Sequence, residues 1–329
     1  MKKLSRSEIG AFLRDGDHFG ILTHRRPDGD TLGSAAALCR GLRAMGKEAW
    51  ILPNPEITPK FIPMHDGLTC EGYREGMTLV SVDTSAVDML PKEYQPLADR
   101  ISLIIDHHGS NKEFAPQGIV DSGAAACGEI ICDLLREMGV PMDRETAEAI
   151  YVAISTDTGC FRYSNTTAHT LRTAAVCMEA GARTHDINFQ LFELQRLSRL
   201  KLNAYLAQHL ELYQEGTIAL CPIPKQAEID CGVVEDDMDS VSNFARNVEG
   251  VKLSVTFREE KPGVTKISAR CADGYNVAKV CIALGGGGHI FAAGASVPCD
   301  MQTTRRKVLE VLREQGYLKE EEFAVSEKE

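Results

Sequence analysis

ISLIIDHH (residues 101–108) is an apolar run that stops abruptly at three polar residues. A short apolar run rich in β-branched side chains is typical of a buried strand. The same pattern recurs in HFGILTH (residues 18–24), which ends at His24, and in TLVSVD (residues 78–83), which ends at Asp83. The sequence therefore predicts a sheet of buried strands, each followed by polar side chains.

Helical patterns alternate with these strands. Residues 30–45, DTLGSAAALCRGLRAM, read as an amphipathic helix, and further helices are expected at about 123–138 and 143–156, with another short strand at 48–52. Strands alternating with helices predict an α/β fold with a mostly parallel, doubly wound N-terminal sheet. In such a sheet the carboxyl ends of the strands line the ligand crevice.

The length of the chain and a long helical stretch predict the domain organisation. At about 150 residues per domain, 329 residues predict about two domains. Residues 1–184 are expected to form the first domain, 185–213 a linker helix without Gly or Pro, 214–318 a smaller α/β C-terminal domain, and 319–329 an acidic, frayed tail.

The net charge limits the possible partners. Lys and Arg number 36 against 47 Asp and Glu, which gives −11. Binding of long nucleic acid regardless of sequence depends on cationic surface, so this charge argues against that class of function. Small anionic substrates, held by local cations or metals, stay compatible with it.

Two further features concern the compartment. No run approaches the roughly 18 apolar residues of a membrane helix, and the N-terminal residues 1–17 lack the apolar stretch of a secretory signal. The chain has 11 cysteines and no C-x-x-C pair. We expect free thiols in a reducing cytoplasm and no membrane partner.

Aspartate and histidine gather where apolar segments end. A desolvated carboxylate is costly unless it is paired, so several of them at one rim require a cation. Carboxylate oxygens with imidazole nitrogens, and no thiolate, suit Mn²⁺, Mg²⁺, Co²⁺ or iron. Such a set is large enough for two ions that share a carboxylate, and two metals about 3.5–4 Å apart commonly hydrolyse phosphate esters. The candidate ligands lie within residues 24–30, at Asp83, within residues 106–108 and at Asp157.

Three of these residues also have ordinary structural interpretations. Asp30 could cap the helix that it opens, and could do so while binding a metal. Asp83 in VDTS could form an Asx turn. Asp157 could terminate the preceding helix before Gly159. For Asp83 we rank metal binding well above the Asx turn because of the residues that accompany it, whereas helix termination stays an open alternative for Asp157.

GGGGH (residues 285–289) is the second polar feature. It follows a helical pattern rather than a strand, so the context of a dinucleotide-binding fingerprint is missing. Four consecutive glycines permit close approach of the backbone to a ligand, which favours a loop that faces a phosphate.

The four N-terminal motifs, HRRPDGDTLGS (24–34), VDTS (82–85), DHH (106–108) and STDTG (155–159), resemble those of the DHH phosphoesterase family. GGGGH, together with ISAR (267–270) and NVEGV (247–251), resembles the DHH-associated C-terminal domain. Order and spacing are most similar to the NrnA-type oligoribonucleases of the family, which also act as phosphatases of 3′-phosphoadenosine 5′-phosphate. The resemblance covers about residues 5–316.

The resemblance implies a role for each matching residue. His24, Asp28 and Asp83 would hold one divalent ion, and Asp30, Asp83, His107 and Asp157 the other, with Mn²⁺ as the expected metal. His108 would face the scissile phosphate, and Asp106 would orient the two histidines. Arg270 and His289 would hold the substrate's terminal phosphate or nucleotide, beside the loop formed by Gly285, Gly286, Gly287 and Gly288.

The resemblance also implies the substrates. They would be short RNA or DNA oligonucleotides, linear dinucleotides and 3′-phosphoadenosine 5′-phosphate. A homodimer packed through the linker helix is compatible with the sequence.

Two other functions stay open. A pyrophosphatase or polyphosphatase of a related family would share the four motifs, but the GGGGH domain lacks a dense Lys/Arg cluster. A nucleotide-binding protein without turnover would be expected to have lost Asp83, His107 or Asp157, and all three are present.

Overall fold

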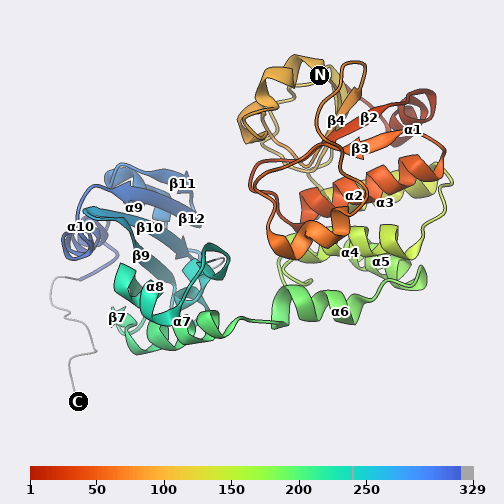
Figure 1. Ribbon diagram of the computed structural model, residues 1–329. Helices are drawn as coiled ribbons and strands as arrows, with labels where there is room; N and C mark the ends of the chain where they lie inside the picture. The colour runs from red at the N-terminus through yellow and green to blue at the C-terminus, as the bar shows by residue number, and fades with distance from the viewer. Residues whose placement is uncertain (239–240, 320–329) are drawn as a thin grey trace. The chain divides into compact units, whose positions relative to one another are not determined.

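The computed structural model describes residues 1–238 and 241–319. The chain divides into an N-terminal unit, Met1–Leu194, and a C-terminal unit that begins at Gln195. Each unit is built around its own six-stranded sheet (Figure 1).

The N-terminal sheet is parallel throughout, with the order β1-β6-β5-β4-β2-β3. Because β2, β4 and β5 are neighbours, the polar residues that follow these three strands lie at one edge of the sheet. The α/β class expected from the sequence is confirmed. The strands are β1 Lys2–Lys3, β2 Phe19–Leu22, β3 Ala49–Ile51, β4 Thr78–Val82, β5 Ile101–Asp106 and β6 Gln117–Val120.

Helices α2, α3 and α4 stack along one face of this sheet (Figure 1). Alternate strand residues such as Val80 and Ile105 pack against them, whereas Leu79 and Ile104 point to the other face, which 3₁₀ helices and loops cover. The helices are α1 Arg6–Asp15, α2 Gly29–Ala44, α3 Cys127–Glu137, α4 Arg144–Asp157, α5 Ala168–Glu179 and α6 Thr184–Asn188. The 3₁₀ helices are η1 Pro59–His65, η2 Val87–Met89 and η3 Gln95–Arg100.

The C-terminal sheet is mixed, with the order β11-β12-β10-β9-β8-β7. Within the described residues of this sheet, only β8 and β9 pair in parallel. Its strands are β7 Glu211–Tyr213, β8 Ile218–Ile223, β9 Leu253–Lys261, β10 Val264–Cys271, β11 Gly287–His289 and β12 Ala292–Val297. Its helices are α7 Leu197–Gln208, α8 Lys225–Cys231, α9 Val277–Ala283 and α10 Met301–Glu314, with 3₁₀ turns η5 Glu235–Met238, η6 Val241–Asn243 and η7 Ala245–Asn247.

The expectation of an uninterrupted linker helix over residues 185–213 is wrong. After α6 the chain forms a π turn, Phe189–Glu193, becomes extended at Leu194, and returns to a helix only in α7. Helices in proteins are stabilised mainly by packing of an apolar face. Leu202 and Leu206 in α7 are buried in the C-terminal unit, whereas Ile187 in α6 packs on the N-terminal core. The helix is therefore interrupted between the residues that pack on these two cores.

The glycine run is also not a simple loop. Gly285 ends α9 with φ +83°, but Gly287–His289 form the edge strand β11, paired with β12. A Cβ on Gly286 would lie 2.2 Å from the carbonyl oxygen of Gly294, and one on Gly288 would lie 2.6 Å from Cα of Ala293. These glycines are therefore required by the close approach of β12, independently of any ligand.

Two remaining expectations concern the ends of the chain and the membrane. The acidic tail expected over residues 319–329 lies outside the described residues except for Lys319. Within the described part of the chain, no helix has both the length and the apolar character needed to cross a membrane.

Candidate functional site

The six candidate metal ligands converge at the carboxyl edge of the N-terminal sheet. Together with His108 they form three groups of His and Asp ligand atoms, and within each group the atoms lie no more than 4.8 Å apart. The groups are His24, Asp28 and Asp83; Asp30, His107 and Asp157; and Asp83, His107 and His108. The ligands that follow β2, β4 and β5 meet because neighbouring parallel strands end at one rim, and Asp157 is added from the C-terminal end of α4.

Asp83 occupies the centre of the cluster. Its two carboxylate oxygens face different histidines: Oδ2 lies 3.7 Å from Nε2 of His24, and Oδ1 lies 3.4 Å from Nε2 of His107. The residue follows β4 with a left-handed φ of +50°, a backbone conformation that is uncommon outside glycine and often found at functional sites. This position turns one side chain toward both halves of the cluster.

The electrostatics at Asp83 call for a cation. The side chain is 2% exposed, and Oδ1 has no hydrogen-bond partner among the described residues. Burial, followed by repulsion from Asp30 and Asp28, raises the pKa of Asp83 well above its ordinary value. An unpaired buried carboxylate among other carboxylates is costly, so the donor set fits divalent metal ions.

Asp30 is held by Ser34 of its own helix, whose hydroxyl donates to Oδ1 at 3.1 Å, and by the start of another helix. Its carboxylate accepts backbone hydrogen bonds from Cys127 (2.7 Å) and Gly128 (3.0 Å) in the first turn of α3, while Asp28 caps α2. Burial and the neighbouring Asp157 nonetheless raise the pKa of Asp30 well above its usual range. The interpretation of Asp30 as the N-cap of its own helix is therefore wrong. Asp30 accepts hydrogen bonds from the first backbone N–H groups of α3, whereas Asp28 is the N-cap of α2.

The two metal-facing histidines are oriented by backbone carbonyls. Nδ1 of His24 lies 2.8 Å from the carbonyl oxygen of Arg25, and Nδ1 of His107 lies 3.2 Å from that of Ala124. Because a carbonyl only accepts, Nδ1 carries the proton in each neutral ring. The lone pair then sits on Nε2, which faces the aspartates, as in most metal-binding histidines.

Asp106 contacts only one of the two histidines that it was expected to orient. Its fully buried carboxylate accepts from Nδ1 of His108 (2.8 Å) and from the amide of Asn111 (2.6 Å). Burial alone would raise its pKa, but these two hydrogen bonds hold the pKa of Asp106 below its ordinary value. The expectation for His107 is wrong, since the carbonyl of Ala124 orients that ring.

The side chains of Arg270 and His289 share one face of the C-terminal sheet. Both residues pair with Ala292, from the strands on either side of β12. Directly opposed residues point to the same face, and two strand spacings are about 9.6 Å. Burial and the nearby charge of Arg246 lower the pKa of Arg270, and no ion pair with a carboxylate is found for Arg270 among residues 1–238 and 241–319. This face therefore offers a cation that is not neutralised by the described residues.

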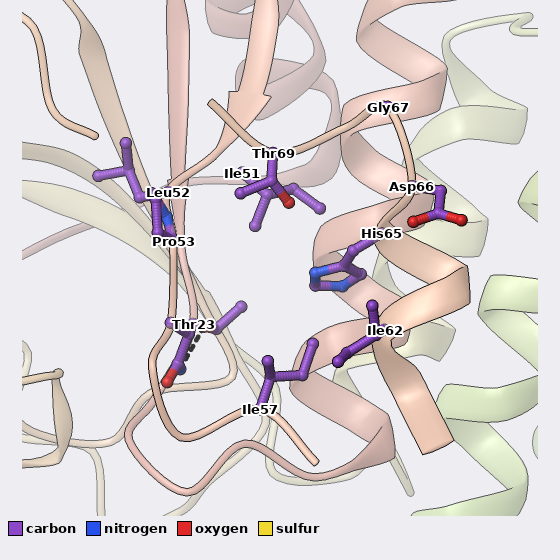
Figure 2. Close-up of a pocket in the computed structure, with 11 residues that line it drawn as sticks. Thr23, Ile51, Leu52, Pro53, Ile57, Ile62, His65, Asp66, Gly67 and Thr69 are labelled. Carbon is purple, nitrogen blue, oxygen red and sulfur yellow. Dashed lines mark hydrogen bonds between the residues drawn. The ribbon is translucent and has the colours of Figure 1, made fainter. Parts of the chain in front are cut away.

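A pocket of about 320 Å³ opens beside β2 and β3 (Figure 2). Asn54 connects it to the cluster, because its amide donates both to the hydroxyl of Thr23, which lines the pocket, and to the carbonyl of His24. The ring of His65 points toward the space, and its Nε2 lies 3.0 Å from the carbonyl oxygen of Leu32, so Nδ1 is left as an acceptor. Aliphatic walls with few polar groups are typical of small-molecule pockets. The aliphatic lining is Ile51, Leu52, Pro53, Ile57 and Ile62.

Several residues of this site were missed in the sequence. Asn54, Asn111 and Asn165 each donate side-chain amide hydrogens to the backbone or to a carboxylate around the predicted ligands. Asn111, three residues after His108, could have been suspected from its closeness to the DHH motif. Nothing in the local sequence marks the other two.

Comparison with known proteins agrees with this arrangement. Residues 18–154 match the DHH family, N-terminal domain, and residues 226–315 match the DHHA1 domain. The bifunctional oligoribonuclease and PAP phosphatase NrnA of Thermus thermophilus is 33% identical over 308 residues, which cover 91% of both chains. The protein of the same name from Bacillus subtilis is 28% identical over 284 residues, covering 84% of this chain and 89% of the relative.

A solved structure shares the fold of the whole chain. The crystal structure of an exopolyphosphatase-related protein from Bacteroides fragilis superposes with a TM-score of 0.85 at 22% identity, covering 94% of this chain and 95% of the other. Together, the matched domains, the coverage of the relatives and the Asp/His cluster lead to one conclusion: the chain belongs to the DHH family of phosphoesterases and carries a DHHA1 domain in its C-terminal unit.

Proposed function

We propose that this phosphoesterase hydrolyses short oligoribonucleotides, linear dinucleotides and 3′-phosphoadenosine 5′-phosphate with two divalent ions, Mn²⁺ being the expected metal. The relatives named as oligoribonuclease and PAP phosphatase support the substrate class. The observation that carries the chemistry is the buried carboxylate of Asp83, which lies between two histidines and whose Oδ1 has no hydrogen-bond partner among the described residues. The 11 cysteines, all free, support a cytoplasmic location.

The two sets of ligands in this proposal share Asp83. His24, Asp28 and Asp83 hold one, and Asp30, Asp83, His107 and Asp157 hold the other. When bound, a pair of divalent ions supplies an activated water and offsets negative charge at phosphorus.

The chain's own residues then orient the substrate. His108 is 43% exposed, and its Nδ1 donates to the carboxylate of Asp106. This hydrogen bond raises the pKa of His108, and the protonated ring carries a second N–H, on Nε2, that can donate to a phosphate oxygen. Asp106, fixed in turn by Asn111, keeps this ring in one orientation. Removing such an orienting carboxylate commonly costs roughly 10–100-fold in activity.

Recognition of the distal part of the substrate is assigned to the face that carries Arg270 and His289. Arg270→Ala is expected to lower kcat/KM on dinucleotides by roughly 10–100-fold, because a lost charge-assisted hydrogen bond is worth about 1.5–3 kcal/mol. A nitrophenyl phosphodiester, which has no second phosphate, should be cleaved almost normally. Lys266→Ala, on the same strand and face, is the matched control. Equal losses on both substrates, or none on either, would refute the assignment.

We infer that the pocket beside β2 and β3 receives a base of the substrate. Its aliphatic walls suit a flat ring, and Nδ1 of His65 suits an exocyclic amine or ring N–H. Filling the pocket by Ile62→Trp is expected to reduce kcat/KM on dinucleotides by roughly tenfold or more, while nitrophenyl phosphodiester cleavage persists. Leu171→Trp, an exposed leucine on α5, is the control. Unchanged dinucleotide kinetics in Ile62→Trp would show that no base binds there.

A further inference from the structure

Residues 124–128, which comprise the last three residues before α3 and its first two, make backbone hydrogen bonds to two of the proposed ligands. The carbonyl of Ala124 orients His107, and the backbone N–H of Cys127 donates to the carboxylate of Asp30. The position of this segment therefore decides where both side chains point. Any group that fixes the segment relative to the remaining ligand would set the geometry of the site.

Asn165 makes that connection. Its amide nitrogen lies 3.1 Å from the carbonyl oxygen of Ala125 and 3.2 Å from that of Asp157. The two amide hydrogens can thus serve one carbonyl each. Asp157 is the last residue of α4, so its carbonyl has no partner within the helix. Asn165 joins the segment behind His107 and Asp30 to the helix end that bears Asp157.

We propose that Asn165 is a positioning residue that preassembles Asp30, His107 and Asp157 for one metal ion. The inference rests on the proposed metal site and adds to it the residue that fixes the site's geometry. No hydrogen bond from Asn165 to any of the three side chains is found among the described residues, and it acts through backbone carbonyls on either side of them.

The choice of amide fits this role. Two facing carbonyls need a donor with two hydrogens on one atom, which an aspartate lacks and a serine supplies only once. The amide oxygen, by contrast, is buried without a hydrogen-bond partner among the described residues. The donor pair is therefore the part of Asn165 that the site uses.

Asn188 provides a matched control. Its amide donates to the hydroxyl of Tyr151, also on α4, at 3.0 Å, and its oxygen is likewise buried and unpartnered in the described structure. Asn188→Ala therefore removes a comparable hydrogen bond to the same helix. It leaves the carbonyls of Ala125 and Asp157 bound to Asn165.

The experiment is calorimetric titration of the metal-free protein with Mn²⁺. Asn165→Ala should bind one of the two Mn²⁺ ions roughly 10–100-fold more weakly than wild type. Asn165→Ser keeps one side-chain hydrogen-bond donor, so its affinity for that ion should lie between those of Asn165→Ala and wild type. With saturating metal, kcat should drop in both variants while KM for a dinucleotide stays nearly constant. Asn188→Ala should bind both ions as wild type does.

Three outcomes overturn the inference. Asn165→Ala could bind Mn²⁺ with wild-type affinity, Asn188→Ala could lose as much affinity as Asn165→Ala, or Asn165→Ser could match wild type. If Asn165→Ala fails to fold, the comparison of Asn165→Ser with Asn188→Ala decides. Asp157→Asn tests the proposed metal site separately. If Asp157→Asn also binds two Mn²⁺ ions with wild-type affinity, the metal site itself is wrong. If Asp157→Asn loses Mn²⁺ affinity while Asn165→Ala binds Mn²⁺ normally, only the positioning role of Asn165 is refuted.

Discussion

Asp83→Asn should abolish most of the activity, lowering kcat/KM by roughly a thousandfold. The residue faces both histidines of the cluster, so one substitution disturbs both proposed metal positions. Charge stabilisation by a metal is worth several kcal/mol, and about 4 kcal/mol corresponds to this factor. Steady-state kinetics on a dinucleotide at saturating Mn²⁺, with bound metal counted by elemental analysis, measures the effect. Asp88→Asn, an exposed aspartate nearby in the sequence, should behave as wild type.

The same substitution should stabilise the metal-free protein. Burial and neighbouring carboxylates raise the pKa of Asp83 well above 3.8. The folded state then binds more protons than the unfolded state, so the metal-free wild type loses stability as pH rises from about 3.8 through the raised pKa. The asparagine of the variant is uncharged at every pH, so it adds no such pH-dependent loss of stability. Above that window, the metal-free variant should unfold at a higher temperature than wild type, and below it the difference should shrink. A lower unfolding temperature for the variant at neutral pH would contradict this account of the cluster.

Removal of divalent ions should abolish hydrolysis and lower the unfolding temperature. In the metal-free chain the buried aspartates of the cluster repel one another, as the raised pKa values of Asp30 and Asp83 indicate. Ions that bind only the folded state stabilise it in proportion to the logarithm of their concentration over Kd. Readdition of Mn²⁺ should therefore restore both activity and thermal stability, and thermal shift with parallel assays measures this. Full activity after exhaustive chelation, in protein free of metal by elemental analysis, would refute the metal requirement.

The N-terminal fold could be predicted because its strands are buried on both faces. Runs such as TLVSV and ISLIID have no solvent-facing side to interrupt them, and each ends where polar residues begin. Parallel pairing then brings those ends to one rim, so the amino-acid sequence alone was enough to place Asp83 beside His107. The alternation of strands and helices, and the polar residues that end a strand, are local properties of the sequence and can therefore be predicted from it.

The sequence-based predictions were wrong where contacts between residues far apart in the chain determine the structure. Residues 185–213 contain no helix breaker, yet the helix is interrupted because its two ends pack on different cores. Asp30 caps α3, which begins 97 residues later, so its capping partner could not be recognised locally. Asn165 likewise acts through two carbonyls, at positions 125 and 157, that only the folded chain brings together. Side-chain amides carry no periodic signal, and their roles follow from tertiary placement.

The most direct test of the central claim is one substrate panel at saturating Mn²⁺. Initial rates are compared for a linear dinucleotide, 3′-phosphoadenosine 5′-phosphate, a long single strand and inorganic pyrophosphate, with Asp83→Asn as the blank. The net charge of −11 argues against binding of long strands, which depends on cationic surface. The account therefore predicts rapid hydrolysis of the first two substrates and little of the others. Turnover of the long strand equal to that of the dinucleotide, or of pyrophosphate in preference to both nucleotides, would contradict it.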